Sequence, residues 1–515
     1  MSPRLNALIA CVFLLGLAHA TSQLTATERA QYLEEVQIGT MPAWLVLPVP
    51  APTDRFGPPD PPSPRPPVVI VAHGFSASRQ AMSWLVRSLA RNGFAVLAGD
   101  FRGHGQNTAP FNRLELSADI DRLIAYAKSR PEVDGTRIAL VGHSMGAFAV
   151  YSYALEHRNV DAVIPVSGSA AGGDRTRPRN ALLIVASGDP ERIRTASRDA
   201  MTRLTAGQWP ANPSAAGDLA GGTARDLVEI PGHDHVTILF SDVAARRIVE
   251  WLRGTWDLEA KPFVPTPGSV TRDGLVAVAS GLLLFFPLVG FLGAGILRVR
   301  PAPGAPRPGA IWMAAAATIV AGVALFAGTP LSFLPFAAGN QLQSFYLVAG
   351  VVYWLWVRRQ PRAQASDWSD RLRAVALGIA AFALVYCTFG LAASRVFFNL
   401  MMSGQRTFWF IVTAPLFLPL GLGLETALRP PGGMRATARS LAAKALLVFG
   451  MVIAINVFGT LPPVIGLMVP SLLIVLPIVE ALAAALYTVS GNVVASGVLT
   501  ALMLAWLPAA IFPIM

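Results

Sequence analysis

The sequence predicts an α/β domain, with a mostly parallel sheet and helices on both faces, followed by an all-α transmembrane bundle. Short β-rich runs alternate with helical stretches in the first half of the chain, and apolar segments of membrane-spanning length fill the second. The charges divide in the same way. Thr21 to Arg272 contains 26 Lys and Arg against 25 Asp and Glu, whereas Asp273 to Met515 contains 14 against 5. With 53% hydrophobic and only 14% charged residues, a single soluble globule is excluded.

Residues 1–20 have the layout of a secretory signal peptide. Arg4 precedes an apolar core over residues 5–17, and Ala18-His19-Ala20 follows as a small-residue cleavage site. A lipoprotein box ending at Cys11 and an uncleaved membrane anchor remain alternatives. In all three cases, the chain from Thr21 onward is expected on the extracytoplasmic side.

The exported α/β domain is expected over residues 21–260. Its predicted strands are Ala43–Val49, Pro67–Ala72, Phe94–Gly99, Arg137–Val141, Ala162–Val166, Ala181–Ala186 and Asp226–Ile230. Its predicted helices are Arg79–Arg91, Ser117–Ser129, Ala147–Leu155 and Asp242–Trp256. Ten prolines in the twenty residues from Pro48 to Pro67 predict an exposed, polyproline-like loop. Residues 261–272 form the linker to the membrane.

About eight transmembrane helices are expected over residues 273–515. The apolar segments lie near 275–297, 311–329, 342–357, 372–393, 407–428, 441–458, 464–487 and 493–514. The first, third and fifth connecting loops are rich in Arg, which predicts that they are cytoplasmic in a bacterial-type inner membrane. Arg395 and Arg406, in a loop assigned outside, do not fit this pattern.

Two carboxylates lie inside the expected membrane segments, where burying a charge is costly. Glu480 is the deeper one, and Glu425 lies near the cytoplasmic end of its helix. We expect Glu480 to be a protonated or hydrogen-bonded packing residue beside Asn456 or Asn492, with a functional site as the alternative.

Composition also restricts the partners. Of the net charge of +11, the second half of the chain carries +9 in short loops between apolar runs, which predicts membrane lipids and no nucleic acid as partners. The two cysteines, Cys11 and Cys387, each lie in an apolar segment and cannot build a disulfide framework. No histidine set has metal-ligand spacing, so no metal or cofactor is expected.

A catalytic nucleophile is predicted at Ser144. Residues 142–146 read Gly-His-Ser-Met-Gly, between the apolar run Ile138–Val141 and the start of a helix. Strand, Gly-x-Ser-x-Gly and helix form a nucleophile elbow, because the sharp turn requires small flanking residues and exposes the serine hydroxyl.

The hydroxyl needs a base, and the base needs a group that orients it. Asp189, at the end of the strand from Ala181, is the expected acid, although an Asp before proline can also simply form a turn. His235 is the expected base, with His233 as the alternative, and Asp234 is expected to make hydrogen bonds within its loop. The backbone N–H groups of Phe75 and Met145 are the expected oxyanion donors.

These segments together resemble the α/β-hydrolase family. They occur in the order His-Gly-Phe (73–75), Asp-Phe-Arg-Gly-His-Gly (100–105), Gly-His-Ser-Met-Gly, Gly-Asp-Pro (188–190) and Gly-His-Asp-His (232–235). The resemblance covers roughly Met41 to Trp256 and implies the esterase, lipase and dienelactone-hydrolase branch. The connection from Val166 to Ala181 is too short for the helical cap that many relatives insert there, and the extra length lies between Glu191 and Arg225 instead.

The sequence therefore predicts a membrane-tethered serine hydrolase that cleaves small-molecule or lipid esters through an acyl-enzyme intermediate. Ser144 is the expected nucleophile, His235 the base and Asp189 the orienting acid. A membrane-bound serine peptidase is the nearest alternative. A transporter or sensor whose hydrolase-like head only binds a ligand is the alternative from another class.

Overall fold

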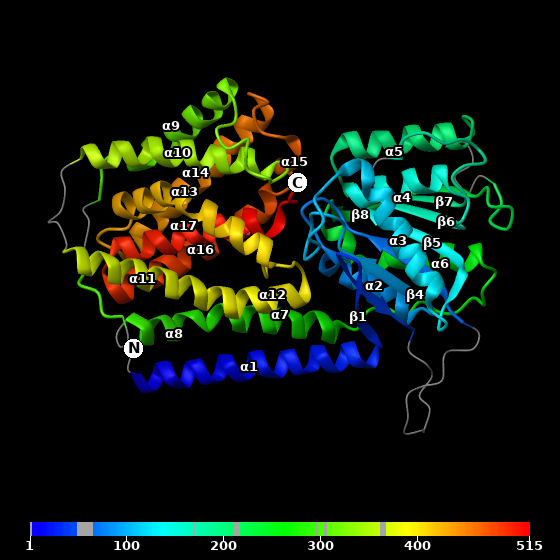
Figure 1. The fold of residues 1–515 in the computed structure, drawn as a ribbon, viewed down its shortest axis with the longest axis horizontal. Helices are drawn as coiled ribbons and strands as arrows, with labels where there is room; N and C mark the ends of the chain where they lie inside the picture. Colours follow the sequence, from blue (N-terminus) through cyan, green and yellow to red (C-terminus); the bar gives the residue numbers. More distant parts are fainter. Residues whose placement is uncertain are drawn as a thin grey trace. The chain divides into compact units, whose positions relative to one another are not determined.

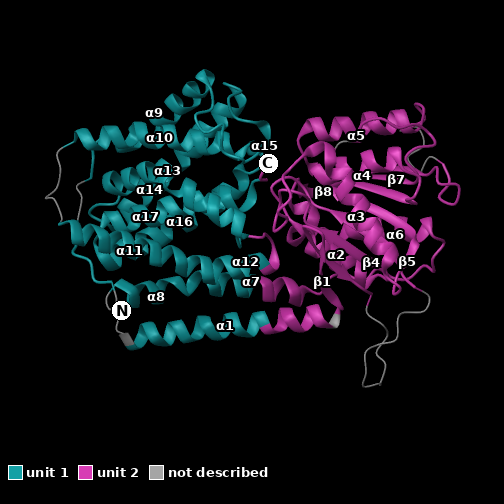
Figure 2. Ribbon diagram, in the orientation of Figure 1, with its two compact units in different colours: residues 1–21, 275–394, 400–512 teal, residues 22–274, 395–399, 513–515 magenta. Residues whose placement is uncertain are grey.

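The computed structural model describes residues 3–48, 65–168, 170–209, 217–293, 297–302, 306–360 and 367–515. Most of the expected proline-rich loop therefore lies outside the described residues. The chain forms two compact units (Figure 2). The sheet unit comprises residues 22–274, 395–399 and 513–515, and the helical unit comprises residues 1–21, 275–394 and 400–512.

The sheet unit is built on one eight-stranded, mostly parallel sheet (Figure 1). The strands are β1 (Leu33–Ile38), β2 (Met41–Val46), β3 (Pro67–Ala72), β4 (Ala95–Gly99), β5 (Asp134–His143), β6 (Ala162–Val166), β7 (Ala181–Gly188) and β8 (Arg225–Asp234). Their order is β1-β2-β4-β3-β5-β6-β7-β8. The β1–β2 and β2–β4 pairs are antiparallel, and every pair from β4 to β8 is parallel.

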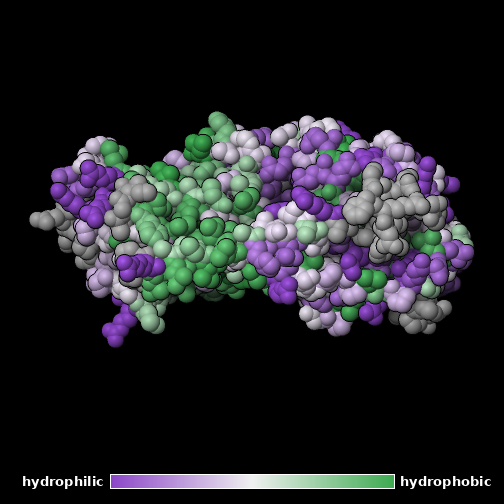
Figure 3. Space-filling view, turned by 90° about the horizontal axis from the view of Figure 1, so that it is seen from below, coloured by the Kyte–Doolittle hydropathy of each residue, from purple (hydrophilic) through white to green (hydrophobic). Residues whose placement is uncertain are grey.

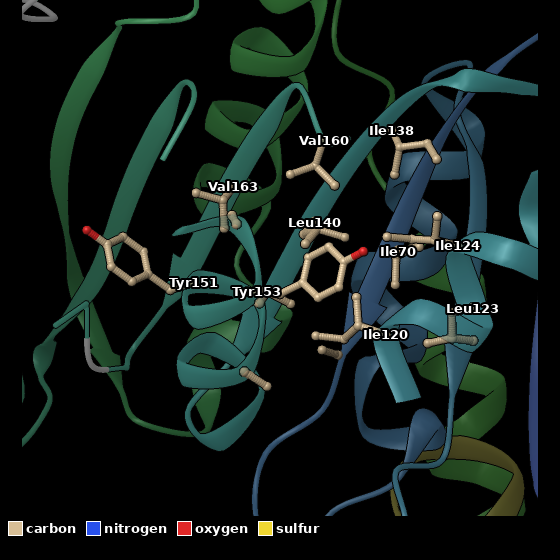
Figure 4. Close-up of a cluster of buried hydrophobic side chains, with 14 of the residues drawn as sticks. Ile70, Ile120, Leu123, Ile124, Ile138, Leu140, Tyr151, Tyr153, Val160 and Val163 are labelled. Atoms are coloured by element: carbon tan, nitrogen blue, oxygen red, sulfur yellow. The ribbon is translucent and has the colours of Figure 1, made fainter. Parts of the chain in front are cut away.

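Alternation along the strands creates a hydrophobic core on each face of the sheet. In β3, Val68 and Ile70 pack into one core, whereas Val69 and Val71 pack into the other. Figure 4 shows part of the first core, where Ile70 lies among the aliphatic side chains of the neighbouring helix and strands. The burial of both faces explains why the central strands are continuous apolar runs.

Helices cover both faces of the sheet. They are α2 (Ser83–Arg91), α3 (Leu116–Ser129), α4 (Met145–Glu156), α5 (Glu191–Leu204) and α6 (Asp242–Thr255). Residues of α3, α4 and α5 belong to the core shown in Figure 4, and residues of α2 and α6 belong to the other. The predicted fold class is confirmed, because a mostly parallel sheet with helices on both faces precedes an all-helical region.

Three elements of the structure differ from the predicted ones. The edge strand β1 reads Leu-Glu-Glu-Val-Gln-Ile and is half exposed, so it lacks the apolar run that identifies a buried strand. Helix α5 lies in the arginine-rich segment that was predicted only as extra length. Helix α1 runs without interruption from Pro3 to Ala30, so the predicted cleavage site lies within it.

The helical unit contains most of the long apolar helices. Its principal helices are α7 (Gly268–Leu283), α8 (Phe285–Phe291), α9 (Ala310–Ala324), α10 (Gly339–Arg359), α11 (Trp368–Val385), α12 (Leu391–Val396), α13 (Gly404–Leu428), α14 (Gly433–Asn456), α15 (Pro463–Gly466), α16 (Val469–Ser490) and α17 (Val493–Ile511). Eight helical spans in the described part of the chain are long and apolar enough to cross a membrane: Arg4–Arg29 and seven after residue 267. Helix α10, the third segment expected from sequence, is a further 21-residue helix outside that set.

Arginine-rich loops meet at one end of the helical unit, which we call the basic end. Arg300 accepts a hydrogen bond from Asn492 through its carbonyl oxygen (3.0 Å), and its guanidinium lies 3.6 Å from Asp370. The Arg307 N–H donates to Ala427 O (3.1 Å). These contacts join the segment between α8 and α9 to the first turn of α11, the last turn of α13 and the turn after α16. Figure 3 shows hydrophilic residues gathered at the left end of this unit, beside a broad hydrophobic band.

The expected surroundings of Glu480 are wrong. Its carboxylate accepts hydrogen bonds from Arg429 (2.5 Å), Lys444 (2.6 Å) and Ser440 (2.7 Å), and not from Asn456 or Asn492. Glu425 accepts two bonds from the same Arg429 guanidinium, at 2.7 and 2.9 Å. All four charged side chains are at most 2% exposed. A buried carboxylate is tolerated here because two cations from other parts of the bundle neutralise two anions.

The two arginines that did not fit the charge pattern of the loops both make hydrogen bonds with local partners. Arg395 belongs to the sheet unit, where its guanidinium donates to Glu28 at 2.9 Å. Arg406 is buried and donates to the carbonyl oxygens of Ala509 and Phe512, near the end of α17. A cation at a helix C-terminus satisfies carbonyl groups that have no partner within the helix.

Candidate active site

Ser144 lies at a strained turn between β5 and α4. Its backbone angles, φ 56° and ψ −111°, are unfavourable for any residue with a side chain. The two flanking glycines are required because the neighbouring backbone leaves no room for a Cβ atom at either position. A Cβ at Gly142 would lie 2.3 Å from Gly146 O, and one at Gly146 would lie 2.4 Å from Ala72 O. The glycines thus permit the close packing that holds Ser144 above the carboxyl edge of the sheet.

His235 lies between Ser144 and Asp189. Its Nε2 is 3.0 Å from Ser144 Oγ, and its Nδ1 is 2.7 Å from Asp189 Oδ1. The histidine follows β8, whereas the aspartate follows β7, so the parallel strands deliver both side chains to the edge that carries the serine. The structure therefore brings together the three residues expected to form the triad.

Asp189 is held as a hydrogen-bond acceptor. Its Oδ2 accepts from the Ser167 hydroxyl at 2.6 Å and from the Ala186 backbone N–H at 2.8 Å, and Oδ1 faces His235. Burial is the largest influence and acts to raise the pKa of Asp189. The hydrogen bonds from His235, Ser167 and Ala186 together outweigh it and hold the pKa below its usual value. The carboxylate can therefore orient His235 while charged.

Two further histidines support the site. His143 Nε2 lies 2.7 Å from the carbonyl oxygen of His235, so it donates a hydrogen bond to the backbone of the expected base. Burial, and then the neighbouring His235 ring, lower the pKa of His143 to about 3, which keeps it neutral. His73 accepts from the Phe101 N–H through Nε2 (3.0 Å) and lies 2.8 Å from Gly74 O through Nδ1.

The role of His143 was missed from sequence, because it occupies a variable position of the Gly-x-Ser-x-Gly pattern. Its hydrogen bond to the segment around residue 235 forms only in the folded sheet. No local spacing indicates such a contact. His73 has the structural hydrogen-bonding role expected for it, and it ties together two loops at the carboxyl edge of the sheet.

The expected oxyanion donors lie on the two segments that flank the serine. Met145 is the first residue of α4, where backbone N–H groups have no partner within the helix. The loop that carries Phe75 passes against the nucleophile, since a Cβ at Gly74 would lie 3.2 Å from Ser144 Cβ. The Phe75 and Met145 amides thus belong to neighbouring turns beside Ser144.

A tightly bonded loop after β4 forms part of the rim. Asp100 is buried and accepts from the Arg79 backbone N–H (2.8 Å) and the Gln106 N–H (2.9 Å). Gly103 accepts from the Ile514 N–H at 3.0 Å, within the same compact unit. Next to it, the Phe75, His104 and Phe111 rings pack edge-on with centroids 5.2–5.9 Å apart. This aromatic cluster gives the rim an apolar wall.

The remaining candidates lie outside the triad. His233 lies near the end of β8, and the nitrogens that face Ser144 and Asp189 belong to His235. Asp234 accepts from the Val236 and Thr237 amides at 2.9 and 2.8 Å, which is the loop role expected for it. Among the described residues, no group of three or more His, Cys, Asp or Glu side chains could hold a metal ion.

Comparison with protein families gives a match at the same segment. A family described as "Serine aminopeptidase, S33" (Hydrolase_4) matches residues 63–200, which include β3 to β7, Ser144 and Asp189. The sheet order, the strained serine turn and this match agree. The sheet unit is an α/β-hydrolase domain. The match does not extend into the helical unit.

Curated relatives that are similar to part of this chain include a cutinase and a terephthalate-ester hydrolase. The chain is 30% identical over 105 residues to "Cutinase est1" of Thermobifida alba, covering 19% of this chain and 34% of that protein. It is 30% identical over 99 residues to "Bis(hydroxyethyl) terephthalate hydrolase" of Streptomyces coelicolor, covering 19% and 32%. The chain thus spans about a third of the length of these relatives.

Solved structures similar to the chain include a dienelactone hydrolase of Anabaena variabilis, 21% identical with a TM-score of 0.32, covering 43% of this chain and 95% of that one. A monoacylglycerol lipase of Paleococcus ferrophilus is 18% identical with a TM-score of 0.29, covering 36% and 95%. The fold of the sheet unit is defined independently by its own strand order.

Proposed function

We propose that the chain is a membrane-tethered serine hydrolase that cleaves carboxylic ester bonds through an acyl-enzyme intermediate. The observation that carries the proposal is the continuous set of contacts from Ser144 Oγ through the His235 ring to Asp189 Oδ1. The partial likeness to a cutinase and a terephthalate-ester hydrolase supports an ester as the substrate.

The reaction follows from these contacts. His235 Nε2 takes the proton of Ser144 Oγ as that oxygen attacks the ester carbonyl carbon, and the Phe75 and Met145 amides stabilise the oxyanion. The imidazolium, oriented by Asp189, then gives its proton to the leaving alkoxide, and the acyl group stays on Ser144. A water molecule attacks the acyl-enzyme with His235 again as base. The carboxylic acid leaves and Ser144 regains its proton.

The helical unit is proposed to anchor the enzyme in a membrane, with the hydrolase domain on the extracytoplasmic face. The eight apolar spans support the anchoring. Loops rich in Arg usually face the cytoplasm, which assigns the basic end to that side. Helices α7 and α8 precede the basic segment 298–302 in the chain and together form one candidate span, so the residues that precede α7 would lie across the membrane from that segment. A lipid or other acyl ester beside the bilayer is the proposed substrate class.

A peptide substrate is the second candidate, because the matching family is described as a serine aminopeptidase. The full chain in detergent should be tested with p-nitrophenyl butyrate, p-nitrophenyl palmitate and leucine p-nitroanilide. The proposal expects turnover of the esters and little of the anilide, and preferential anilide cleavage would favour the peptidase. No turnover of any of the three by a folded preparation would instead favour a ligand-binding head.

The variants are chosen as matched pairs. Ser144→Ala should lower the ester kcat by at least about 10⁴-fold, whereas Ser129→Ala, whose exposed hydroxyl bonds Tyr126 O, should be neutral. His235→Ala should be nearly inactive and His233→Ala should remain active. The opposite histidine result would assign the base to His233.

A further inference from the structure

The helical unit contains a hollow at its basic end, which we call the arginine pocket. Its described lining residues are Pro306, Arg307, Pro308, Gly309, Ala310, Ile311, Trp312, Ala427, Leu428 and Arg439. These residues come from the turn before α9, the first turn of α9, the end of α13 and the second turn of α14. The cavity volume is about 380 Å³, large enough for a phosphate-bearing headgroup but small for a complete lipid.

The two charges in this lining are both positive. Arg307 and Arg439 carry them, and the described lining contains no Asp or Glu. Hydrogen bonds fix both residues in place. The Arg307 backbone N–H donates to Ala427 O at 3.1 Å, and the Arg439 guanidinium donates to Pro430 O at 2.9 Å and Leu428 O at 3.4 Å. The backbone of Arg307 and the guanidinium of Arg439 are thus held by hydrogen bonds beside the same hollow.

One donor of a lining residue lacks a partner among the described residues. Arg307 Nε is buried, and none of the described residues accepts a hydrogen bond from it. A buried donor without an acceptor is unfavourable, and one on a guanidinium especially so. An oxyanion with several acceptor oxygens would satisfy this donor, and it would also balance the charge of the two arginines.

The surroundings of the pocket indicate that the anion carries an apolar chain. Trp312 lines the pocket and is 78% exposed. Exposed apolar side chains continue along this helix at Ile319 and Val323, spaced seven and four residues apart, so they lie on one face. Phe326, in the 3₁₀ turn that follows α9, is exposed as well. A tryptophan at the polar end of such a face is typical of a residue at the lipid headgroup level.

We propose that the arginine pocket binds the phosphate of an anionic phospholipid, whose acyl chains lie along the exposed face of α9. Charge complementarity selects an anionic headgroup, and the apolar face beside Trp312 selects a lipid over a free anion. This site is separate from Ser144 and independent of the proposed ester hydrolysis.

The test uses the full chain purified in a mild detergent, with lipid binding measured by native mass spectrometry. The protein is titrated with phosphatidylglycerol, and with phosphatidylcholine as the zwitterionic control. Wild type should bind one phosphatidylglycerol in preference to phosphatidylcholine. Arg307→Gln should lower the phosphatidylglycerol affinity about fivefold or more, which corresponds to the loss of one cation near a membrane surface.

Arg435→Gln is the matched control, because Arg435 lies one turn before Arg439 on α14, is exposed and does not line the pocket. It should bind phosphatidylglycerol like wild type. Arg439 also bonds carbonyl groups beyond the end of α13, so Arg439→Lys, which keeps the charge, accompanies Arg439→Gln to separate loss of binding from loss of folding.

Two results would overturn the proposal. Equal phosphatidylglycerol binding by Arg307→Gln and wild type, or an equal loss in Arg435→Gln, would show that the basic end attracts anionic lipid only diffusely. Inorganic phosphate, added in the same detergent to the protein with bound phosphatidylglycerol, provides the second arm. If phosphate at low millimolar concentration displaces phosphatidylglycerol from wild type as effectively as excess lipid does, the pocket binds a free anion and not a lipid.

Discussion

Replacing Asp189 with Asn should inactivate the proposed enzyme by changing the tautomer of His235. In the structure, one carboxylate oxygen accepts from the Ser167 hydroxyl and the Ala186 backbone N–H, and the other faces His235 Nδ1. The Ser167 hydroxyl can turn to accept a hydrogen bond, but the Ala186 N–H can only donate. The amide oxygen of the new Asn must therefore face Ala186, and its NH₂ group must face His235.

That arrangement reverses the hydrogen bond to the base. An NH₂ group facing Nδ1 requires Nδ1 to accept, so the ring proton moves to Nε2, which can then no longer take the proton of Ser144. Where a serine-protease Asp is replaced in this way, kcat falls about 10⁴-fold, or about 5.5 kcal/mol of transition-state stabilisation. We expect a loss of this size for Asp189→Asn.

The assay is the initial rate of p-nitrophenyl butyrate hydrolysis by the detergent-purified chain, with near-ultraviolet circular dichroism as the check on folding. Asp234→Asn is the matched control, because this neighbouring carboxylate bonds only loop groups in the structure and its replacement should leave kcat nearly unchanged. A folded Asp189→Asn variant that retained a tenth or more of the wild-type kcat would refute the tautomer argument.

Three further predictions follow from buried groups. Because the pKa of His143 is lowered from 6.5 to about 3, the folded chain binds fewer protons than the unfolded chain between these two pH values, and its stability should fall as the pH drops through this range. His143→Gln, whose amide can still donate to His235 O, should show a smaller fall in Tm between pH 8 and pH 5 than wild type. An equal fall in Tm would contradict this explanation. Lys444→Met should destabilise the helical unit by about 3–5 kcal/mol, since Glu425 and Glu480 would then share Arg429 and one buried negative charge would be uncompensated. The double variant with Glu480→Gln should recover much of the loss in a thermal melt, and a double variant less stable than the single one would contradict the charge-balance explanation. Gly146→Ala should prevent normal packing of the serine turn because its Cβ would meet Ala72 O at 2.4 Å, and expression as a soluble, active enzyme in detergent would disprove that requirement.

The parts of the structure that could be predicted from sequence are those specified by local patterns. Apolar strands buried on both faces are continuous hydrophobic runs, so β3 to β7 were identified within a few residues. The serine turn was identified because Gly142 and Gly146 are required by close packing. Asp189 and His235 follow consecutive parallel strands, and this topology is what brings them to the same edge of the sheet.

The features that were missed depend on contacts between residues distant in sequence. His143 supports the backbone of His235, 92 residues away, and no local spacing indicates this. Glu480 is paired with Arg429 and Lys444, which are 51 and 36 residues from it, so an isolated Glu in an apolar segment was assigned the wrong neighbours. The edge strand β1 was missed for another reason. Its residues are half exposed and mostly polar, so its sequence lacks the apolar run by which the buried strands are recognised.

The most direct test of the central proposal is covalent labelling of the nucleophile. The detergent-purified chain is treated with a fluorophosphonate probe, and the modified residue is located by peptide mass spectrometry, with Ser144→Ala and Ser129→Ala in parallel. The catalytic proposal expects a single adduct on Ser144 in wild type and Ser129→Ala, and none in Ser144→Ala. A folded wild type that remains unlabelled, or an adduct on a different serine, would contradict the assignment of Ser144 as an activated nucleophile.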